Sequence, residues 1–297
     1  MDACASRTEK NSTSIPHRKK KGEKRKRMKA SYHNSRDFGS PRHNDRSFLK
    51  GLTLEEKYKL APHIIHERTG LNKYVSVYPG KDFRETEVEF YAKIFKPYVD
   101  DVNKKRDRSH HKEVKEGARL TTEMLRLDKL TKPEETIIQI GDMEDYPDDP
   151  KILLRVFEEL QKYSNKITHN HCKILDAAVH MDESTPHIHI RKVWVYEKDG
   201  IKRIGQEESL RWAGIPLPYP DRRQSKFNNR KITYDRMMRE KLIELCKEHG
   251  LEIDTVPDLH NREHLSKEEL ARKVQADRER AERRRRRRQE LRESKRS

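Results

Sequence analysis

Apolar residues along this chain recur with two different periods, and each period predicts a different kind of element. Leu153, Phe157 and Leu160 are spaced as one face of a helix, and the preceding Asp149-Pro150 is typical of a helix start. Apolar runs bounded by turn residues predict strands. The expected strands are Thr136–Ile140, Ile174–His180 and His187–Tyr196, and the expected helices are 149–163, about 85–105, 112–127 and 233–249.

The order of these elements predicts an α+β domain. A helix near 233–249 places Met238, Leu242, Leu245 and Cys246 on one face and ends at Gly250, a pattern of ordinary core packing. The stretch after Ser266 is rich in Glu and Arg and has no apolar seam, so it reads as a solvated or partner-bound helix or disordered chain. We expect a basic arm at 1–30, one domain at 31–265 and a charged tail at 266–297.

The net charge of +17 lies in the two ends of the chain. Residues 1–50 hold 15 Lys and Arg against 5 Asp and Glu, and residues 271–297 hold 13 against 5, so the body is nearly neutral. Such arms, which include Arg283, Arg284 and Arg285, suit a polyanion, and the first choice is nucleic acid. An acidic membrane surface is the weaker choice, because the N-terminal arm lacks an apolar face.

Other features of the composition indicate a soluble protein inside the cell. No stretch reaches the roughly 18 apolar residues of a membrane span, and the start is too polar for a signal peptide. Cys4, Cys172 and Cys246 are widely separated, which favours a reducing compartment without a disulfide framework.

Three histidines and two carboxylates fall within ten positions, in the string His180-Met-Asp182-Glu183-Ser-Thr-Pro186-His187-Ile-His189. On a strand, His187 and His189 leave the same face, and a turn around Pro186 brings His180 to them. The alternative is a set of hydrogen-bonded surface histidines that binds no ion. Pro186 excludes a helical zinc-protease motif, and the absence of Cys-x-x-Cys excludes a zinc deaminase. The pattern favours an all-imidazole divalent site with an open position, suited to Zn, Mn, Ni or Cu.

This string resembles the third motif of the MobV/Pre family of plasmid mobilisation relaxases, a branch of the HUH endonucleases. Two upstream segments resemble the other motifs of that family: His43-Asn44-Asp45-Arg46-Ser47-Phe48, and His66 to Tyr74, which contains Asn72. A first copy of the His-Asn-x-Arg-x-Phe pattern begins at His33, so two nucleophile candidates exist. The spacing to Asn72 favours His43. The resemblance covers about residues 31–265, although the polar start leaves open whether the usual N-terminal strand is present.

The resemblance implies an antiparallel sheet that carries the His-x-His strand near its middle, flanked by helices. It implies a relaxase that nicks one DNA strand at a transfer origin and keeps the 5′ end as a phosphohistidine, in a bacterial cytoplasm with the nucleoid or plasmid. DNA, single-stranded or hairpin with flanking duplex, would be its main partner, with the conjugation coupling machinery as a further candidate partner and no membrane insertion. The alternatives are a rolling-circle replication initiator using a tyrosine, with Tyr32, Tyr74 and Tyr91 available, and a non-catalytic DNA-binding relative.

Charge considerations give each site residue an expected role. His180, His187 and His189 would hold a divalent ion, Mn or Mg in use with Zn or Ni as alternatives, that takes up charge on the phosphate. Glu183 would activate the nucleophile, and Asp182 would orient a metal histidine. Arg46 is expected to belong to the catalytic group with His43 and Glu183 and, like Arg191, to contact flanking phosphates. Further contacts to DNA are expected from Asn44, Asn72, Arg283, Arg284 and Arg285.

Overall fold

The computed structural model describes residues 28–35, 40–108, 119–142, 146–147, 149–255 and residue 276. Its strands are β1 (Met28–Asn34), β2 (Lys73–Ser76), β3 (Glu134–Ile140), β4 (Cys172–His180), β5 (His187–Lys198), β6 (Ile201–Ile204) and β7 (Ile253–Asp254). Its α-helices are α1 (Pro41–Asn44), α2 (Leu54–Leu60), α3 (Phe83–Arg108), α4 (Thr122–Leu127), α5 (Pro150–Ile167), α6 (Gln206–Trp212) and α7 (Arg230–Glu248). Two 3-10 helices, η1 (Ser47–Leu49) and η2 (His66–Leu71), lie in the N-terminal third. The predicted arginine contacts 283 to 285 fall outside the described residues.

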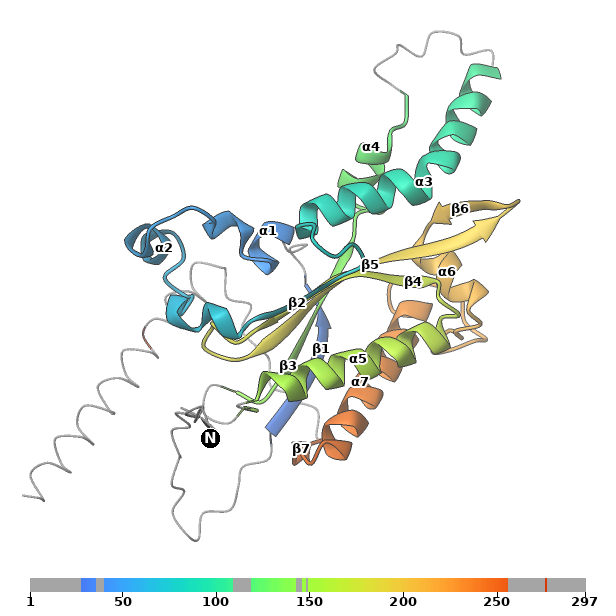
Figure 1. Cartoon of the computed structure of the whole chain (residues 1–297). Coiled ribbons are helices and arrows are strands. Elements are labelled where there is room, and N and C mark those ends of the chain that lie inside the picture. The colour runs from blue at the N-terminus through green and yellow to red at the C-terminus, as the bar shows by residue number, and fades with distance from the viewer. Residues whose placement is uncertain are drawn as a thin grey trace, which may run out of the picture.

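One sheet organises the domain, in the strand order β2-β4-β5-β3-β1-β7, with β6 paired to the far part of β5 (Figure 1). All pairs are antiparallel except β1 with β7. The strand β5, which carries His187 and His189, therefore lies between β4 and β3 in the interior of the sheet. The predicted fold class, an α+β domain with a mostly antiparallel sheet flanked by helices, is confirmed.

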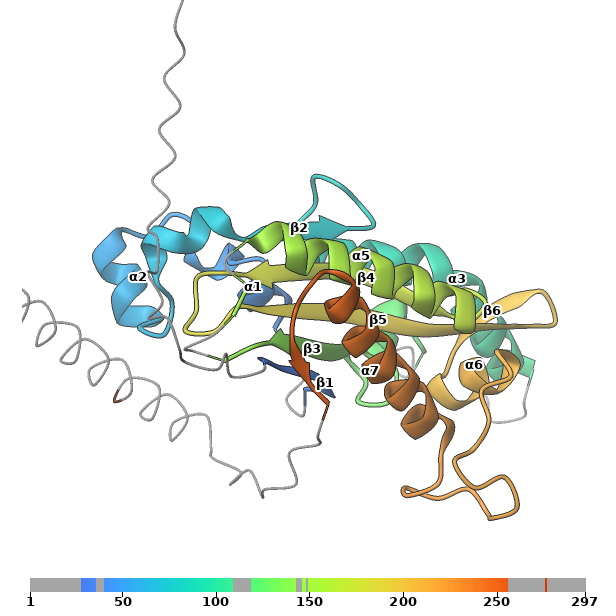
Figure 2. The same cartoon turned by 90° about the horizontal axis from the view of Figure 1, so that it is seen from below.

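Helices cover both faces of the sheet. Figures 1 and 2 show α5 and α7 on one face and α3 on the other. The larger core includes Leu153 of α5, Leu242 of α7, and Ile188 and Ile190 of β5. A smaller core joins Phe95 of α3 to the opposite face. Alternation along β5 thus directs isoleucines into the larger core and leaves histidines on the α3 face.

Most predicted elements are confirmed, and one needs correction. The predicted strands correspond to β3, β4 and β5, and Asp149 accepts a hydrogen bond from the backbone of Lys151 at the start of α5. The expected helix 112–127 starts too early. Residues 119–121 are not helical, and α4 begins after Thr121, whose side chain accepts from Met124 N.

The N-terminal strand that the polar start left in question is present as β1, which pairs with β3 through Ala30 opposite Ile140. Ala30 is buried and His33 is exposed, so β1 has one buried face and one exposed face. The buried face, together with pairing to β3, is sufficient to hold this polar segment as a strand. Among the described residues, no helix combines the length and apolar character that crossing a membrane requires.

Candidate active site

Three histidines meet where β4 ends and β5 begins. His180, the last residue of β4, lies opposite His187, the first of β5, in antiparallel register. His189 shares their face, because side chains two apart on a strand point the same way. The centroids of the three rings lie between 4.7 and 5.2 Å apart. The structure therefore brings together the three residues that the sequence predicts as metal ligands.

Hydrogen bonds fix which nitrogen of each ring carries the proton. His180 Nε2 donates to the backbone oxygen of Asn44 at 2.7 Å, and His187 Nδ1 donates to the backbone oxygen of Thr185 at 2.9 Å. His189 Nδ1 donates to the carboxylate of Glu135 at 3.0 Å. Since these oxygens can only accept, His180 Nδ1, His187 Nε2 and His189 Nε2 each keep a free lone pair. Donating the second ring nitrogen in this way is typical of metal-binding histidines.

The free lone pairs face one another. His187 Nε2 and His189 Nε2 are 2.9 Å apart, and two ligand nitrogens bound about 2.1 Å from one ion at a right angle would be about 3.0 Å apart. His180 Nδ1 is buried and has no hydrogen-bond partner among the described residues. Burial lowers the pKa of both His180 and His189, which keeps their rings neutral. These residues fit a divalent cation, which would satisfy lone pairs that otherwise repel.

Glu183 adds a carboxylate beside this cluster. Its Oε1 lies 3.6 Å from His180 Nδ1, and its Oε2 lies 4.0 Å from His187 Nε2. His180, Glu183 and His187 together form one group of potential metal ligands. Burial by itself would raise the pKa of Glu183, but His187, His43 and Arg46 hold this pKa well below its usual value. Glu183 is therefore an anion at neutral pH.

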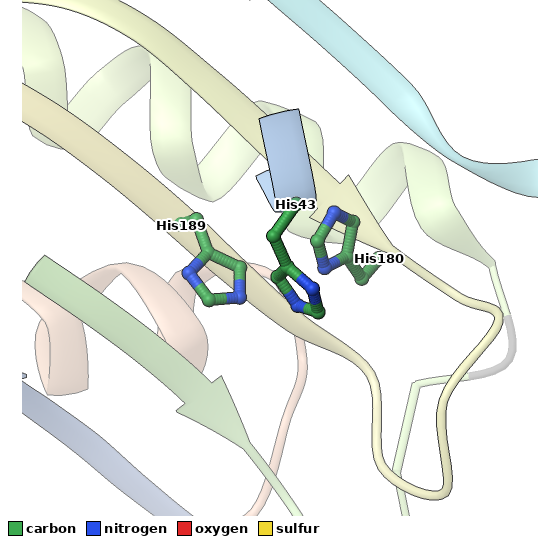
Figure 3. Close-up of side chains that lie close together, drawn as sticks. All are labelled: His43, His180 and His189. Atoms are coloured by element: carbon green, nitrogen blue, oxygen red, sulfur yellow. The ribbon is translucent and has the colours of Figure 1, made fainter. Parts of the chain in front are cut away.

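His43, on the short helix α1, lies against the histidine cluster formed by His180, His187 and His189 (Figure 3). Its ring centroid is 5.9 Å from that of His180 and 6.0 Å from that of His189. The same ring stacks with those of Phe48 and His63, each at a centroid distance of 5.8 Å. His43, His180 and His189 form a second group of potential ligands. About a third of the His43 side chain is exposed, so this ring can be reached from solvent.

The two nucleophile candidates lie at different distances from the cluster. His33 is exposed on β1, opposite Ile137 of β3, which in turn lies opposite His189 of β5. Two inter-strand spacings separate His33 from His189, about 10 Å. His43 therefore lies beside the cluster and His33 does not.

Three tyrosines were candidates for the alternative nucleophile. Tyr32 packs against the larger core on the other face, where its hydroxyl accepts a hydrogen bond from Lys192, and Tyr91 is a buried residue of α3 in the smaller core. Tyr74 is partly exposed on β2 and its hydroxyl accepts from Asn72. None of the three has a ring contact with the histidine cluster among those the structure describes.

Arg46 joins the N-terminal motif to the turn between β4 and β5. It is buried and donates two hydrogen bonds to Asp182, at 3.1 and 2.7 Å, and one to Glu183 at 2.7 Å. Its Nη1 lies 3.2 Å from His43 Nε2. Burial would lower the pKa of Arg46, but Asp182 and Glu183 raise it above its usual value. The guanidinium thus orients the two carboxylates and His43, and is not exposed as a phosphate contact.

Asp182 does not contact a metal histidine, which corrects the role expected for it. Its carboxylate accepts from Arg46 and from Asn72 Nδ2, at 2.7 Å, and its backbone oxygen accepts from Ile65 N at 2.6 Å. It therefore fixes the turn that carries Glu183.

The two asparagines predicted to contact DNA are buried in the protein instead. Asn44 is fully buried and donates to Glu135 at 2.7 Å, while its backbone holds His180. Asn72 accepts from Met181 N at 2.7 Å. Arg191, also predicted as a phosphate contact, is buried and pairs with Glu87 at 2.8 Å. These three residues act through other protein groups in this structure.

Glu135 is the functional residue that the sequence analysis missed. It lies on β3, and its carboxylate holds both His189 and Asn44. Burial alone would raise the pKa of Glu135, yet His189 and Asn44 lower it to about 2. Glu135 directly precedes the predicted strand 136–140 in the sequence, but its contact with His189 depends on the register between β3 and β5.

Comparison with known proteins gives a family match across the centre of the chain. Residues 95–211 match the family described as plasmid recombination enzyme (Mob_Pre). The matched stretch contains His180, His187 and His189, whereas His43 precedes it. The resemblance that the motifs predict is thereby confirmed. None of the curated proteins matches the chain.

Solved structures with a similar arrangement are relaxase domains of MobM (MOBV; Mob_Pre). One is an Mn-bound crystal structure at pH 4.6 with 22 nucleotides of oriT DNA from plasmid pMV158. It is 17% identical, with a TM-score of 0.45, over 83% of this chain and 100% of that chain. Another, at pH 6.8 with a 3′-thiophosphate on the DNA, is also 17% identical with a TM-score of 0.45, over 84% of this chain and 100% of the other.

Proposed function

We propose, from the match of residues 95–211 to the plasmid recombination enzyme family, that this protein is a metal-dependent DNA relaxase. It would nick one strand at the transfer origin of a mobile element and keep the 5′ end bound to His43. The observation that carries this proposal is the placement of a partly exposed imidazole, His43, against three imidazoles, two of them buried, whose free lone pairs converge.

His180, His187 and His189 would hold the divalent ion, with Glu183 within reach of it. Bound there, the ion would stabilise the negative charge that develops on the non-bridging oxygens of the scissile phosphate. Three imidazole ligands leave other coordination positions open for oxygen atoms, an arrangement that Mn²⁺ accepts. Mn²⁺, the ion bound in the compared MobM domains, is the metal to test first.

His43 would be the nucleophile. One ring nitrogen forms a bond to phosphorus while the bond from phosphorus to the 3′ oxygen breaks. The 3′ oxygen leaves as a hydroxyl after gaining a proton, and the 5′ phosphate stays on His43 as a phosphoramidate. The other ring nitrogen gives up its proton, which balances the proton gained by the 3′ oxygen, while the Glu183 carboxylate lies beside the ring, with Oε1 3.7 Å from His43 Nε2. Because the low pKa of Glu183 keeps it ionised, it can orient and stabilise the charged ring.

Arg46 and Asp182 would act as positioning residues in this reaction. The guanidinium of Arg46 contacts both Glu183 and His43, and a hydrogen bond to Asp182 holds the guanidinium in place. A reacting imidazole must be held about 3 Å from phosphorus in a reactive pose, which requires such fixed partners.

A nicking assay tests the proposed function. The substrate is a supercoiled plasmid that carries the DNA flanking the protein's own gene, incubated with Mn²⁺ or with EDTA. The expected product is an open circle with protein attached to the 5′ end, formed only with the metal. Binding of this DNA without any nick would favour the non-catalytic alternative.

A further inference from the structure

The loop between α6 and α7, residues 213–229, exposes aromatic and cationic side chains together. Phe227 is 74% exposed and Tyr219 is 54% exposed. The guanidinium of Arg222 lies 4.9 Å from the centre of the Tyr219 ring, and Lys226 Nζ lies 4.8 Å from that of Phe227. Large aromatic rings of a folded protein are usually buried, so two exposed rings paired with cations indicate a binding surface.

The loop has a defined shape, because Asn228 fixes it from within. The Asn228 side chain is buried, accepts from Tyr219 N at 3.0 Å, and donates to the backbone oxygens of Tyr219, Arg222 and Arg223. The next residue, Asn229, accepts from Ile232 N at the start of α7. The exposed rings are therefore presented by an ordered frame and do not result from an unstructured segment.

The charge on this loop is not neutralised by the protein. Arg222, Arg223 and Lys226 form no ion pair with any carboxylate of the described residues, whereas the adjacent Arg230 pairs with Glu207. Asp221 is the single acidic residue from 219 to 229. The loop thus carries two net positive charges next to two flat apolar rings.

We infer that this loop, through Tyr219, Arg222, Arg223, Lys226 and Phe227, is a second contact surface for single-stranded DNA. The inference rests on the proposed DNA substrate. Exposed rings stack on unpaired bases of any sequence, and the cations beside them neutralise phosphates, which is the combination that single-strand-binding surfaces use. A base-paired duplex would hide the faces of its bases from both rings, so the unpaired strand is the better fit.

The surface lies far from the histidine cluster. The cluster is at the start of β5, whereas the loop joins α6 to α7 on the side of the domain that carries β6 (Figures 1 and 2). Only single-stranded DNA long enough to extend well past the scissile phosphate could contact both the histidine cluster and the loop.

Binding of fluorescein-labelled single-stranded oligonucleotides of increasing length tests the inference, with the full chain and its variants. On long oligonucleotides, Phe227→Ala should weaken binding roughly fivefold or more, with no change in the dependence on salt. The double variant Arg222→Ala/Arg223→Ala should lower the magnitude of the slope of log K against log salt by about 1.4, which is about 0.7 for each lost phosphate contact. Asn228→Ala should also weaken binding, although it removes neither a ring nor a charge.

The matched control is Lys96→Ala/Lys104→Ala on the exposed side of α3, which removes the same charge from the opposite face of the sheet. If the control and the loop variants lose the same affinity for DNA, the effect is due to the overall positive charge of the protein, and the inference is overturned. Unchanged binding by Phe227→Ala, with normal binding by the wild type, would also overturn it and leave the proposed relaxase intact. A wild type that binds no DNA would instead remove the proposed function.

Photo-cross-linking provides a direct second measurement. Iododeoxyuridine placed along the oligonucleotide should cross-link to peptides that contain Tyr219 or Phe227, and only when it lies well away from the nick position. Cross-links confined to other peptides, with the wild type bound, would overturn the loop contact. Metal content should equal that of the wild type in every loop variant, because the loop and the histidines do not touch.

Discussion

Glu135 Oε1 accepts a hydrogen bond from His189 Nδ1 at 3.0 Å, although the two residues are 54 positions apart in the sequence. The same oxygen accepts from Asn44. With a pKa of about 2, Glu135 is ionised at neutral pH and keeps the His189 proton on Nδ1. His189 Nε2 is thereby available as a ligand, which makes Glu135 a residue that positions the metal site from a neighbouring strand.

Removing this carboxylate should weaken metal binding without removing a ligand. Glu135→Ala should lower the affinity for Mn²⁺ by about 10- to 100-fold, the usual effect of losing such a partner, and Glu135→Gln should have a smaller effect because its amide oxygen can still accept. Calorimetric titration measures both. Glu197→Ala, an exposed carboxylate at the end of β5, is the control and should bind as the wild type does. Wild-type affinity in Glu135→Ala would contradict the role given to this contact.

The histidine cluster could be predicted from the sequence because its geometry is local. His187, Ile188 and His189 alternate within one strand, and His180 is joined to them by a short turn, so period and turn length were enough. Glu135 depends on which residue of β3 lies opposite β5, and a register between distant strands is set by packing of the whole core.

The same limit explains the errors in the expected roles. Arg46, Asn44 and Asn72 are polar residues in motif-like segments, and direct contact with DNA requires such side chains to be exposed. The structure buries them because the turn that carries Asp182 closes over the N-terminal segment. Burial of a polar group requires partners from other elements, which the sequence of one segment does not reveal.

Replacing the metal ligands gives the most direct test of the cluster. His187→Ala and His189→Ala should each reduce bound metal to well below one ion per chain. The fold should survive, because the neighbouring Ile188 supplies the core contact. Elemental analysis and circular dichroism on the purified variants provide the measurement, and His169→Ala, an exposed histidine after α5, provides the control. Full metal occupancy in both ligand variants would exclude the three-histidine site.

The two nucleophile candidates are separable by adduct formation. His43→Ala should abolish nicking and the covalent DNA–protein product, because its ring is the one beside the cluster. His33→Ala should keep both, with at most weaker binding, since it lies two strands away. A bond between imidazole and phosphorus breaks in mild acid and survives base. An acid-stable adduct on a tyrosine peptide would move the protein to the replication-initiator alternative.

A buried carboxylate under α3 has no hydrogen-bond partner. Asp176 is 1% exposed, and none of the described groups donates to either of its oxygens. A bulge in β4 places it opposite Arg191, but Arg191 Nη1 remains 3.8 Å away, and the guanidinium pairs through Nη2 with Glu87. Burial, together with Glu87, Asp45 and Glu135, raises the pKa of Asp176 to about 8 despite Arg191.

This raised pKa predicts a loss of stability as the pH rises. The folded protein keeps Asp176 protonated up to about pH 8, while the unfolded chain ionises it near pH 4, so the contribution of this group is fully present below pH 4 and is lost as the pH approaches 8. Asp176→Asn, which cannot ionise, should therefore keep its stability as the pH rises from 4 to 8, while the wild type loses roughly a few kcal/mol relative to it because its unfolded chain ionises. The difference should shrink as the pH falls toward 4. Urea unfolding at a series of pH values measures it, with the exposed Asp221→Asn as the control. A difference that does not depend on pH would mean that Asp176 is ionised in the folded protein and is satisfied by Arg191.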